Sequence, residues 1–247
     1  MAELFEAACR SDDEAAWDAI AALHYRGSRD VLDRALLLIC SPDPKHRARA
    51  ADILGQLGIP DRSFPDEGFA AVLPLLEDEA LPVMSAAIYS LQHIDEERAT
   101  PHILPFADHA DGGIRLAVAQ ALGTVDTSAS QHALLKLMSD VDPDVRNWAT
   151  LGIGQLSEAD TDEIREALNA RLADDDGDVR YEAIIGLARR RDLRSLGYLK
   201  TMLHEEPDDD AIRWAAAMLL GIDNRDDVTT SDLLGGLQRL QLWNKRR

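Results

Sequence analysis

Apolar positions recur along this chain in a pattern whose copies are 31 to 37 residues apart. In each copy a small residue lies three positions after a shared anchor, and a leucine or isoleucine lies seven positions after it, as Ala50 and Leu54 do after Arg47. These offsets keep apolar side chains on one face of a helix. The anchors are Ala16, Arg47, Met84, Arg115, Arg146, Arg180 and Arg213. A repeat of this length predicts a stack of helical hairpins rather than a conventional globule.

Polar residues mark where the second helix of each hairpin is expected to begin. Asp43-Pro44 and Asp142-Pro143 combine an N-capping side chain with a proline suited to the first helical turn. Aspartates in this position are Asp12, Asp43, Asp111, Asp142, Asp176 and Asp209. Apolar segments before the turns predict first helices at 31–39, 69–76, 132–138, 164–172 and 196–203. Thr100-Pro101 and Thr161 are expected to start two of the first helices.

Two copies preserve the pattern most fully, Asp142-Pro-Asp-Val-Arg-Asn-Trp-Ala149 and Asp176-Gly-Asp-Val-Arg-Tyr-Glu-Ala183. These strings resemble the HEAT-like repeat family, in the short variety of about 31 residues that is also found in phycobilin lyase subunits. The resemblance implies an aspartate–arginine ladder between neighbouring repeats, with a structural role. Its residues would be Asp43, Arg47, Asp142, Arg146, Asp176 and Arg180.

No segment alternates apolar and polar residues with period two, so the sequence predicts an all-α fold. With the resemblance, this becomes a right-handed α-solenoid of about seven HEAT-like hairpins that spans residues 1–247 as one domain. Residues 223–231 are expected to be a connecting loop before a helix at about 232–243. That helix has Leu233, Leu237 and Leu240 on one side, and would either cap the last repeat or bind a partner.

The third copy departs from the pattern. Met84 replaces the arginine, and residues 58–66, with Pro60 and Pro65, lengthen the connection before it. This segment is expected to be a protruding loop, a local bend or a tolerated surface insertion.

The net charge of −19, from 26 basic and 45 acidic residues, narrows the classes of partner. Such a charge repels phosphate backbones and anionic lipids, so neither nucleic acid nor a membrane is expected to bind. A basic protein is the expected partner, although acidity also serves solubility alone. The chain lacks an apolar stretch of membrane-spanning length, and its acidic start is unlike a secretory signal. Cys9 and Cys40 are expected to be small buried residues of the core, in a protein that is kept in a reducing compartment. We therefore expect a cytoplasmic protein.

Patterns associated with catalysis are missing from the sequence. The histidines form no zinc-protease arrangement, and there is no phosphate-binding glycine loop and no Gly-x-Ser-x-Gly elbow. Deoxyhypusine hydroxylase, an enzyme built on these repeats, binds iron through several His-Glu pairs, but here only His204-Glu205 matches. The acidic runs at 77–79, 174–176 and 208–210 lack calcium-loop spacing and are interpreted as helix-capping acids. We therefore expect no enzyme, no catalytic residue, no metal and no cofactor.

The second helices are the expected binding surface, because they line the concave side in HEAT-like solenoids. Positions one, two and five after each anchor should face this side and carry most of the large aromatic residues. The alternative is a register error of one residue, which would bury the aromatics between repeats. The predicted partner-binding residues, aromatic anchors and flanking acids together, are Trp17, Asp18, Asp52, Tyr89, Leu116, Asp144, Trp148, Asp178, Tyr181, Glu182 and Trp214.

Two functions remain open from the sequence. The favoured one is a non-enzymatic adaptor, scaffold or inhibitor, the last including immunity-type proteins, that binds a basic protein on this face. The alternative, from the resemblance alone, is a phycobilin lyase subunit or a related chromophore-handling protein. Neither the identity of the partner nor the oligomeric state follows from the residues.

Overall fold

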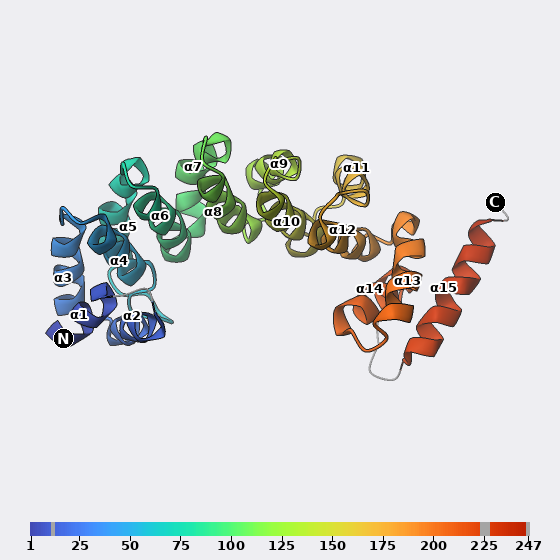
Figure 1. Ribbon diagram of the computed structural model, residues 1–247, viewed down its shortest axis with the longest axis horizontal. Helices are drawn as coiled ribbons and strands as arrows, with labels where there is room; N and C mark the ends of the chain where they lie inside the picture. Colours follow the sequence, from blue (N-terminus) through green and yellow to red (C-terminus); the bar gives the residue numbers. More distant parts are fainter. Residues whose placement is uncertain (11–12, 223–227, 246–247) are drawn as a thin grey trace. The chain divides into compact units, whose positions relative to one another are not determined.

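The computed structural model describes residues 1–10, 13–222 and 228–245. Within these ranges the chain forms fifteen α-helices joined by short turns, and no strand, so the all-α prediction is confirmed (Figure 1). Two compact units make up the chain, Met1–Ala121 and Leu122–Arg247. The expectation of one domain over 1–247 stays a prediction.

Helices alternate between first and second members of hairpins, as the repeat predicts. The first helices are α1 (Ala2–Arg10), α3 (Arg29–Ile39), α5 (Pro65–Val72), α7 (Glu96–Ile103), α9 (Ser128–Leu137), α11 (Asp162–Arg171) and α13 (Leu196–Glu205). The second helices are α2 (Glu14–Arg26), α4 (Pro44–Gly55), α6 (Leu81–Ile94), α8 (Gly112–Gly123), α10 (Pro143–Leu151), α12 (Gly177–Arg189) and α14 (Asp210–Leu220). Short 3₁₀ turns extend α5 (Leu73–Glu77) and α7 (Leu104–Asp108) and precede α13 (Leu193–Ser195), and a π-helical turn (Gly152–Leu156) extends α10.

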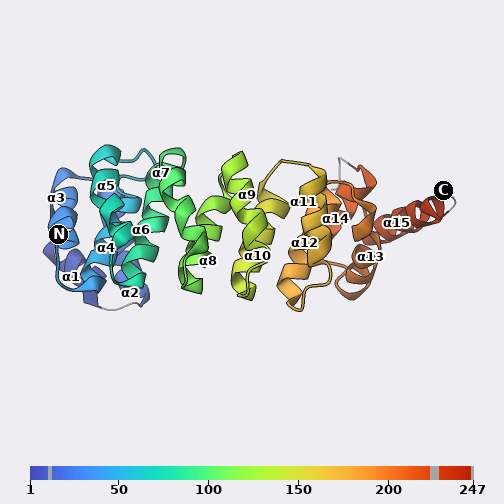
Figure 2. The ribbon, with the colours of Figure 1, turned by 90° about the horizontal axis from the view of Figure 1, so that it is seen from above.

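Neighbouring second helices lie side by side within each unit, as α4 and α6 do in Figure 2. The residue three after each anchor is buried in all seven copies, from Ala19 to Ala216. The residue seven after it is buried in the first six copies and half-buried as Leu220. Because both positions face the neighbouring helices, the repeat spacing sets the core of the stack.

Helix starts follow the predicted capping chemistry with two corrections. Asp43, Asp142 and Asp176 accept hydrogen bonds from backbone N–H groups two residues on, as N-caps do. In the first copy Asp13 caps α2, and Asp12 lies outside the described residues. The Thr100-Pro101 prediction is wrong, because Asp95 caps α7 at Glu96 and Pro101 lies inside the helix.

Two further expectations also change. Cys40 is exposed and Cys9 partly so, and neither is a buried core residue. Residues 58–66 fold back rather than protrude, since Gly58 N donates to His24 O at the end of α2 (2.8 Å). Arg62 Nε donates to His93 O at the end of α6 (3.1 Å), so the connection is held at its start and at its middle.

The ladder exists, but its acids are not the predicted ones. Arg47 donates through Nε and Nη2 to both carboxylate oxygens of Asp78, at 2.7 and 2.8 Å. Arg146 donates in the same way through Nε and Nη2 to the two carboxylate oxygens of Asp174, at 3.0 and 2.8 Å. Each acid lies six residues before the next anchor, and therefore two residues before the N-cap position of the next second helix, which is Ala80 after Asp78 and Asp176 after Asp174. The bidentate pairs hold successive hairpins together.

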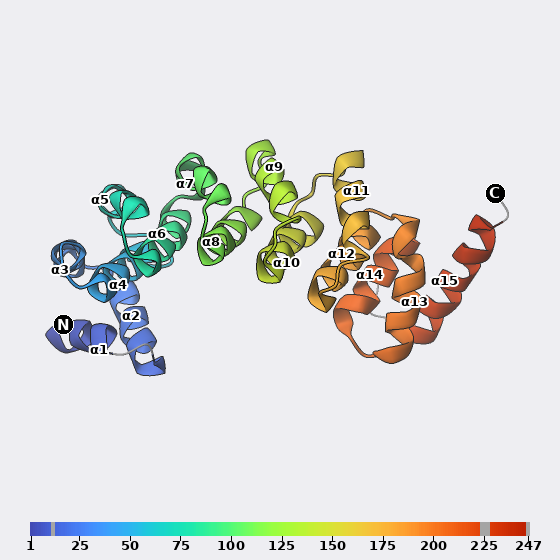
Figure 3. The ribbon, with the colours of Figure 1, turned by 45° about the horizontal axis from the view of Figure 1, so that its top comes forward.

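The last hairpin is covered by α15 (Thr230–Asn244), which packs against α13 and α14 (Figure 3). A reciprocal capping box between Thr229 and Asp232 begins this helix. Leu233 and Leu237 are buried and Leu240 is half-buried, as the spacing predicts. The helix therefore caps the repeats, and residues 223–227 of the expected loop lie outside the described ranges.

Candidate binding grooves

The predicted residues of the first unit meet in one groove of about 570 Å³, formed by α2, α4 and α6 and called here the N-terminal groove. Trp17, Asp52 and Tyr89 come from three consecutive second helices and all line it. The other lining residues are Pro44, Lys45, Ala48, Arg49, Ala80, Pro82, Ser85 and Ala86.

Arg49 organises this groove. Its guanidinium lies 4.6 Å from the centre of the Trp17 ring and its Nη1 donates to Asp52 Oδ2 at 3.0 Å. The Tyr89 hydroxyl donates to the side-chain amide oxygen Oε1 of Gln120, and burial raises the pKa of Tyr89. The lining charges are Lys45 and Arg49 against Asp52 alone, so this groove lacks the predicted excess of acid. Its floor is an internal cation–aromatic–carboxylate network.

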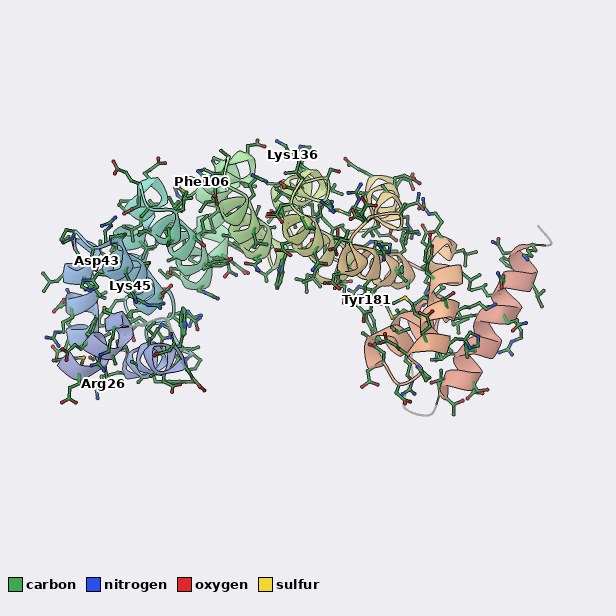
Figure 4. The ribbon with its side chains drawn as sticks, in the orientation of Figure 1. Arg26, Asp43, Lys45, Phe106, Lys136 and Tyr181 are labelled. Atoms are coloured by element: carbon green, nitrogen blue, oxygen red, sulfur yellow. The ribbon has the colours of Figure 1, made fainter. Side chains whose placement is uncertain are left out.

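Tyr181 lies in a second groove of about 670 Å³ between α12 and α13, called here the C-terminal groove (Figure 4). Two tyrosine rings, Tyr181 and Tyr198, and two carboxylates, Glu205 and Glu206, line it. The rest of the lining is Gly177, Arg180, Ile184, Gly197, Thr201 and Met202. Here the predicted combination of aromatic and acidic side chains is present.

The surroundings of Tyr181 are electronegative. Burial, followed by the charges of Asp209, Glu182 and Glu206, raises the pKa of Tyr181 to about 12. Burial also raises the pKa of Glu182, which accepts a hydrogen bond from the Gln155 amide. Because these acids disfavour a further negative charge, the same field favours a cation beside the ring.

The remaining predicted residues lie outside both grooves. Trp148 is 39% exposed, and Trp17 of the N-terminal groove is 50% exposed, so these rings are not sequestered between repeats. Trp214 is half-buried under Arg189, whose guanidinium lies 5.1 Å from the ring centre. Leu116 is also half-buried, whereas Asp18, Asp144 and Asp178 are exposed. The eleven residues therefore do not form one continuous site, and their partner-binding role stays a prediction.

Sequence reasoning missed Tyr198 and Met202, which belong to a first helix. The rule that only second helices supply binding residues excluded them. Tyr198 is 42% exposed, and α13 brings it to the same groove as Tyr181 of the preceding hairpin. An exposed aromatic residue on the polar side of α13 was the available signal.

Among residues 1–10, 13–222 and 228–245 no group of three His, Cys, Asp or Glu side chains is placed to hold a metal ion. None of the helices in this part of the chain is long and apolar enough to cross a membrane.

Comparisons with known proteins agree with the repeat architecture. The family described as HEAT repeats matches residues 37–123, 69–154, 100–170, 132–221 and 161–238. The solved structure of YibA from Escherichia coli is 26% identical with a TM-score of 0.76, and the match covers 96% of this chain and 92% of that one. No curated protein matches the sequence.

Two more distant structures show the fold alone. The complex of CpcE and CpcF of phycocyanin lyase from Nostoc sp. PCC7120 is 18% identical with a TM-score of 0.51, covering 97% of this chain and 94% of that one. An engineered protein is 16% identical with a TM-score of 0.55, covering 86% of this chain and 98% of that one.

Proposed function

Because this chain belongs to the HEAT repeat family, we propose that it is a non-enzymatic interaction protein that binds a basic segment of another protein in the C-terminal groove. HEAT-repeat proteins are of the protein-interaction scaffold type, and an adaptor, a scaffold and an inhibitor would all use such a groove. The observation that carries the proposal is the meeting of Tyr181 and Tyr198 with Glu205 and Glu206 in one groove.

A lysine or arginine side chain fits the chemistry of this groove. Its aliphatic stem would lie against Ile184 and Met202, and its cation would meet the tyrosine rings and the two carboxylates. The acids that raise the pKa of Tyr181 contribute to the same attraction. A preformed groove between two packed helices costs little ordering entropy on binding. The net charge of −19 would also speed encounter with a basic partner.

The proposal is tested with a fluorescently labelled arginine-rich peptide and fluorescence anisotropy. Neutralising the groove in the double variant E205Q/E206Q is expected to weaken binding by about thirtyfold or more, since each of the two lost contacts with a charged group is worth roughly 1 kcal/mol or more. The matched control E3Q/E6Q removes the same charge from exposed positions on α1. Equal affinity of the two double variants would show that only net charge attracts the peptide and would refute the groove.

A tyrosine variant separates aromatic from electrostatic recognition. Tyr181→Ala is expected to weaken binding of the same peptide by roughly tenfold at physiological salt. At that salt concentration long-range charge effects are screened, but the cation–π contact with the tyrosine ring persists. Tyr25→Ala is the control, since Tyr25 is 74% exposed at the end of α2 and lines neither groove. An unchanged affinity in Tyr181→Ala would contradict the proposal.

A chromophore-handling role has less support than peptide binding. The likeness to the CpcE–CpcF complex, at 18% identity, concerns the fold alone. Neither groove offers a feature that favours a tetrapyrrole over a peptide side chain.

A further inference from the structure

The ladder arginines share one arrangement of donors. Nη1 of Arg47 and of Arg146 donates to backbone carbonyls of its own turn, such as Ser41 O and Asp140 O, both at 3.0 Å. That contact fixes the guanidinium plane. Nε and Nη2 then point together at the next repeat and take both oxygens of one carboxylate. Nε and Nη2 together are called here the fork of the arginine. The carboxylate thus binds a fork whose orientation the turn has already fixed.

Arg180 has the first half of this arrangement without the second. Its Nη1 donates to Asp174 O and Asp175 O, at 2.6 and 3.0 Å, so its guanidinium is oriented like the others. Six residues before the next anchor, however, the chain has Pro207 in place of an aspartate. In the part of the chain that the structure describes, no acceptor pairs with Nε or Nη2 of Arg180.

The unmatched fork lies at the C-terminal groove. Arg180 lines this groove together with Gly177, which lies one turn before it on α12. A Cβ added to Gly177 would be 3.6 Å from Arg180 Nη2, so the glycine leaves that donor uncovered. The groove therefore presents an oriented guanidinium next to an aromatic and acidic cation site.

We propose that Arg180 receives the carboxylate of an aspartate or glutamate side chain of the partner, which completes the ladder across the interface. This inference deepens the proposed function and rests on it. Glu205 and Glu206 repel a lone anion, so the carboxylate must arrive on a segment that also carries a lysine or arginine. A purely basic segment still binds the aromatic and acidic side chains, but the groove prefers a short segment with an acidic and a basic residue close together.

A phage-displayed library of random linear peptides, selected on the full chain, tests both the carboxylate site at Arg180 and the proposed function. The expected peptides are enriched in Lys or Arg and carry an Asp or Glu within a few residues. Selection on Arg180→Gln should lose the acidic preference and keep the basic one. Peptides that are basic without an acidic preference, or whose acidic preference survives Arg180→Gln, would overturn the carboxylate site alone. Absence of basic enrichment would overturn the proposed function as well.

A double-mutant cycle on one selected peptide makes the test quantitative. Changing the acidic residue of the peptide to the corresponding amide should weaken binding to the natural chain by about tenfold or more. The same change should not weaken binding to Arg180→Gln, because that variant has already lost the charge-assisted pair with the carboxylate. The peptide change needs no alteration of the protein, so it stays informative if Arg180→Gln is poorly folded. Arg146→Gln is the matched control, since its fork is occupied by Asp174, and should leave the acidic preference intact. Equal loss with Arg180→Gln and Arg146→Gln would contradict the inference.

Discussion

Replacing Arg190 with methionine is expected to destabilise the Leu122–Arg247 unit by about 3 kcal/mol. Arg190 is 8% exposed, and its guanidinium donates only to backbone carbonyls. Four of these, Ile153 O, Gly154 O, Ser157 O and Ala159 O, lie at the π-helical end of α10 and just beyond it, at 2.7 to 3.1 Å. Burial lowers the pKa of Arg190, as expected for a charge taken out of water.

The magnitude follows from the acceptors left behind. The three buried carbonyls and the part-buried Ala159 O, left without this donor, cost about 1 kcal/mol each at the lower end of the range, or about 4 kcal/mol. The apolar methionine side chain recovers roughly 1 kcal/mol through burial. Arg190→Lys keeps the charge but offers fewer donors in a different geometry, so an intermediate loss is expected.

Urea denaturation followed by circular dichroism measures this loss, with Arg26→Met as the control. Arg26 is exposed at the end of α2 (Figure 4), so its substitution should change the unfolding free energy by less than about 0.5 kcal/mol. Hydrogen exchange should show faster opening of amides in α10 and α12 and no change in α4 and α6. An unfolding free energy for Arg190→Met equal to that of Arg26→Met would refute the reasoning.

Three other predictions concern the ladder, pH and the exposed face. A double-mutant cycle of Arg146→Gln and Asp174→Asn should give a coupling of about 1–3 kcal/mol at pH 7, and a coupling near zero would contradict the ladder. Burial lowers the pKa of His24, so its contribution to stability is full above about pH 6.5 and falls as the pH drops below that value; His24→Gln should flatten the decline in a urea titration from pH 7.5 to 5. Trp148→Ala should lower the melting temperature by only a few degrees because the ring is 39% exposed, and a drop comparable to that of Arg190→Met would identify it as core.

The hairpins were predictable because their signals are local. Capping aspartates and prolines, together with alanine and leucine at offsets of three and seven, determine each second helix from neighbouring residues alone. The start of α7 was mispredicted because Thr100-Pro101 resembles a capping pair. The helix begins earlier, because the Asp95 side chain accepts a hydrogen bond from Arg98 N. Pro101 is the sixth residue of α7, beyond the first turn, so the helix lacks the backbone hydrogen bond that another residue would donate there.

Contacts between repeats were harder to predict. The ladder acids Asp78 and Asp174 could have been found from their constant offset to the next anchor. After Asp174, however, the N-capping Asp176 occupies the position that was expected to supply the ladder acid and obscured this offset. Nothing in the sequence around Arg190 indicates that it fills the end of the preceding repeat. The meeting of Tyr181 with Tyr198 depends on how α13 packs beside α12, which the periodicity of either helix alone does not specify.

Two-dimensional NMR of the ¹⁵N-labelled chain, titrated with an arginine-rich peptide, tests the central claim most directly. The backbone amides of the C-terminal groove, in segments 177–184 and 197–206, should show the largest shifts, and they should saturate together. Those of the N-terminal groove should move little, because Arg49 already supplies a cation to Trp17. Shifts spread evenly over the exposed acidic residues of both units would contradict the account.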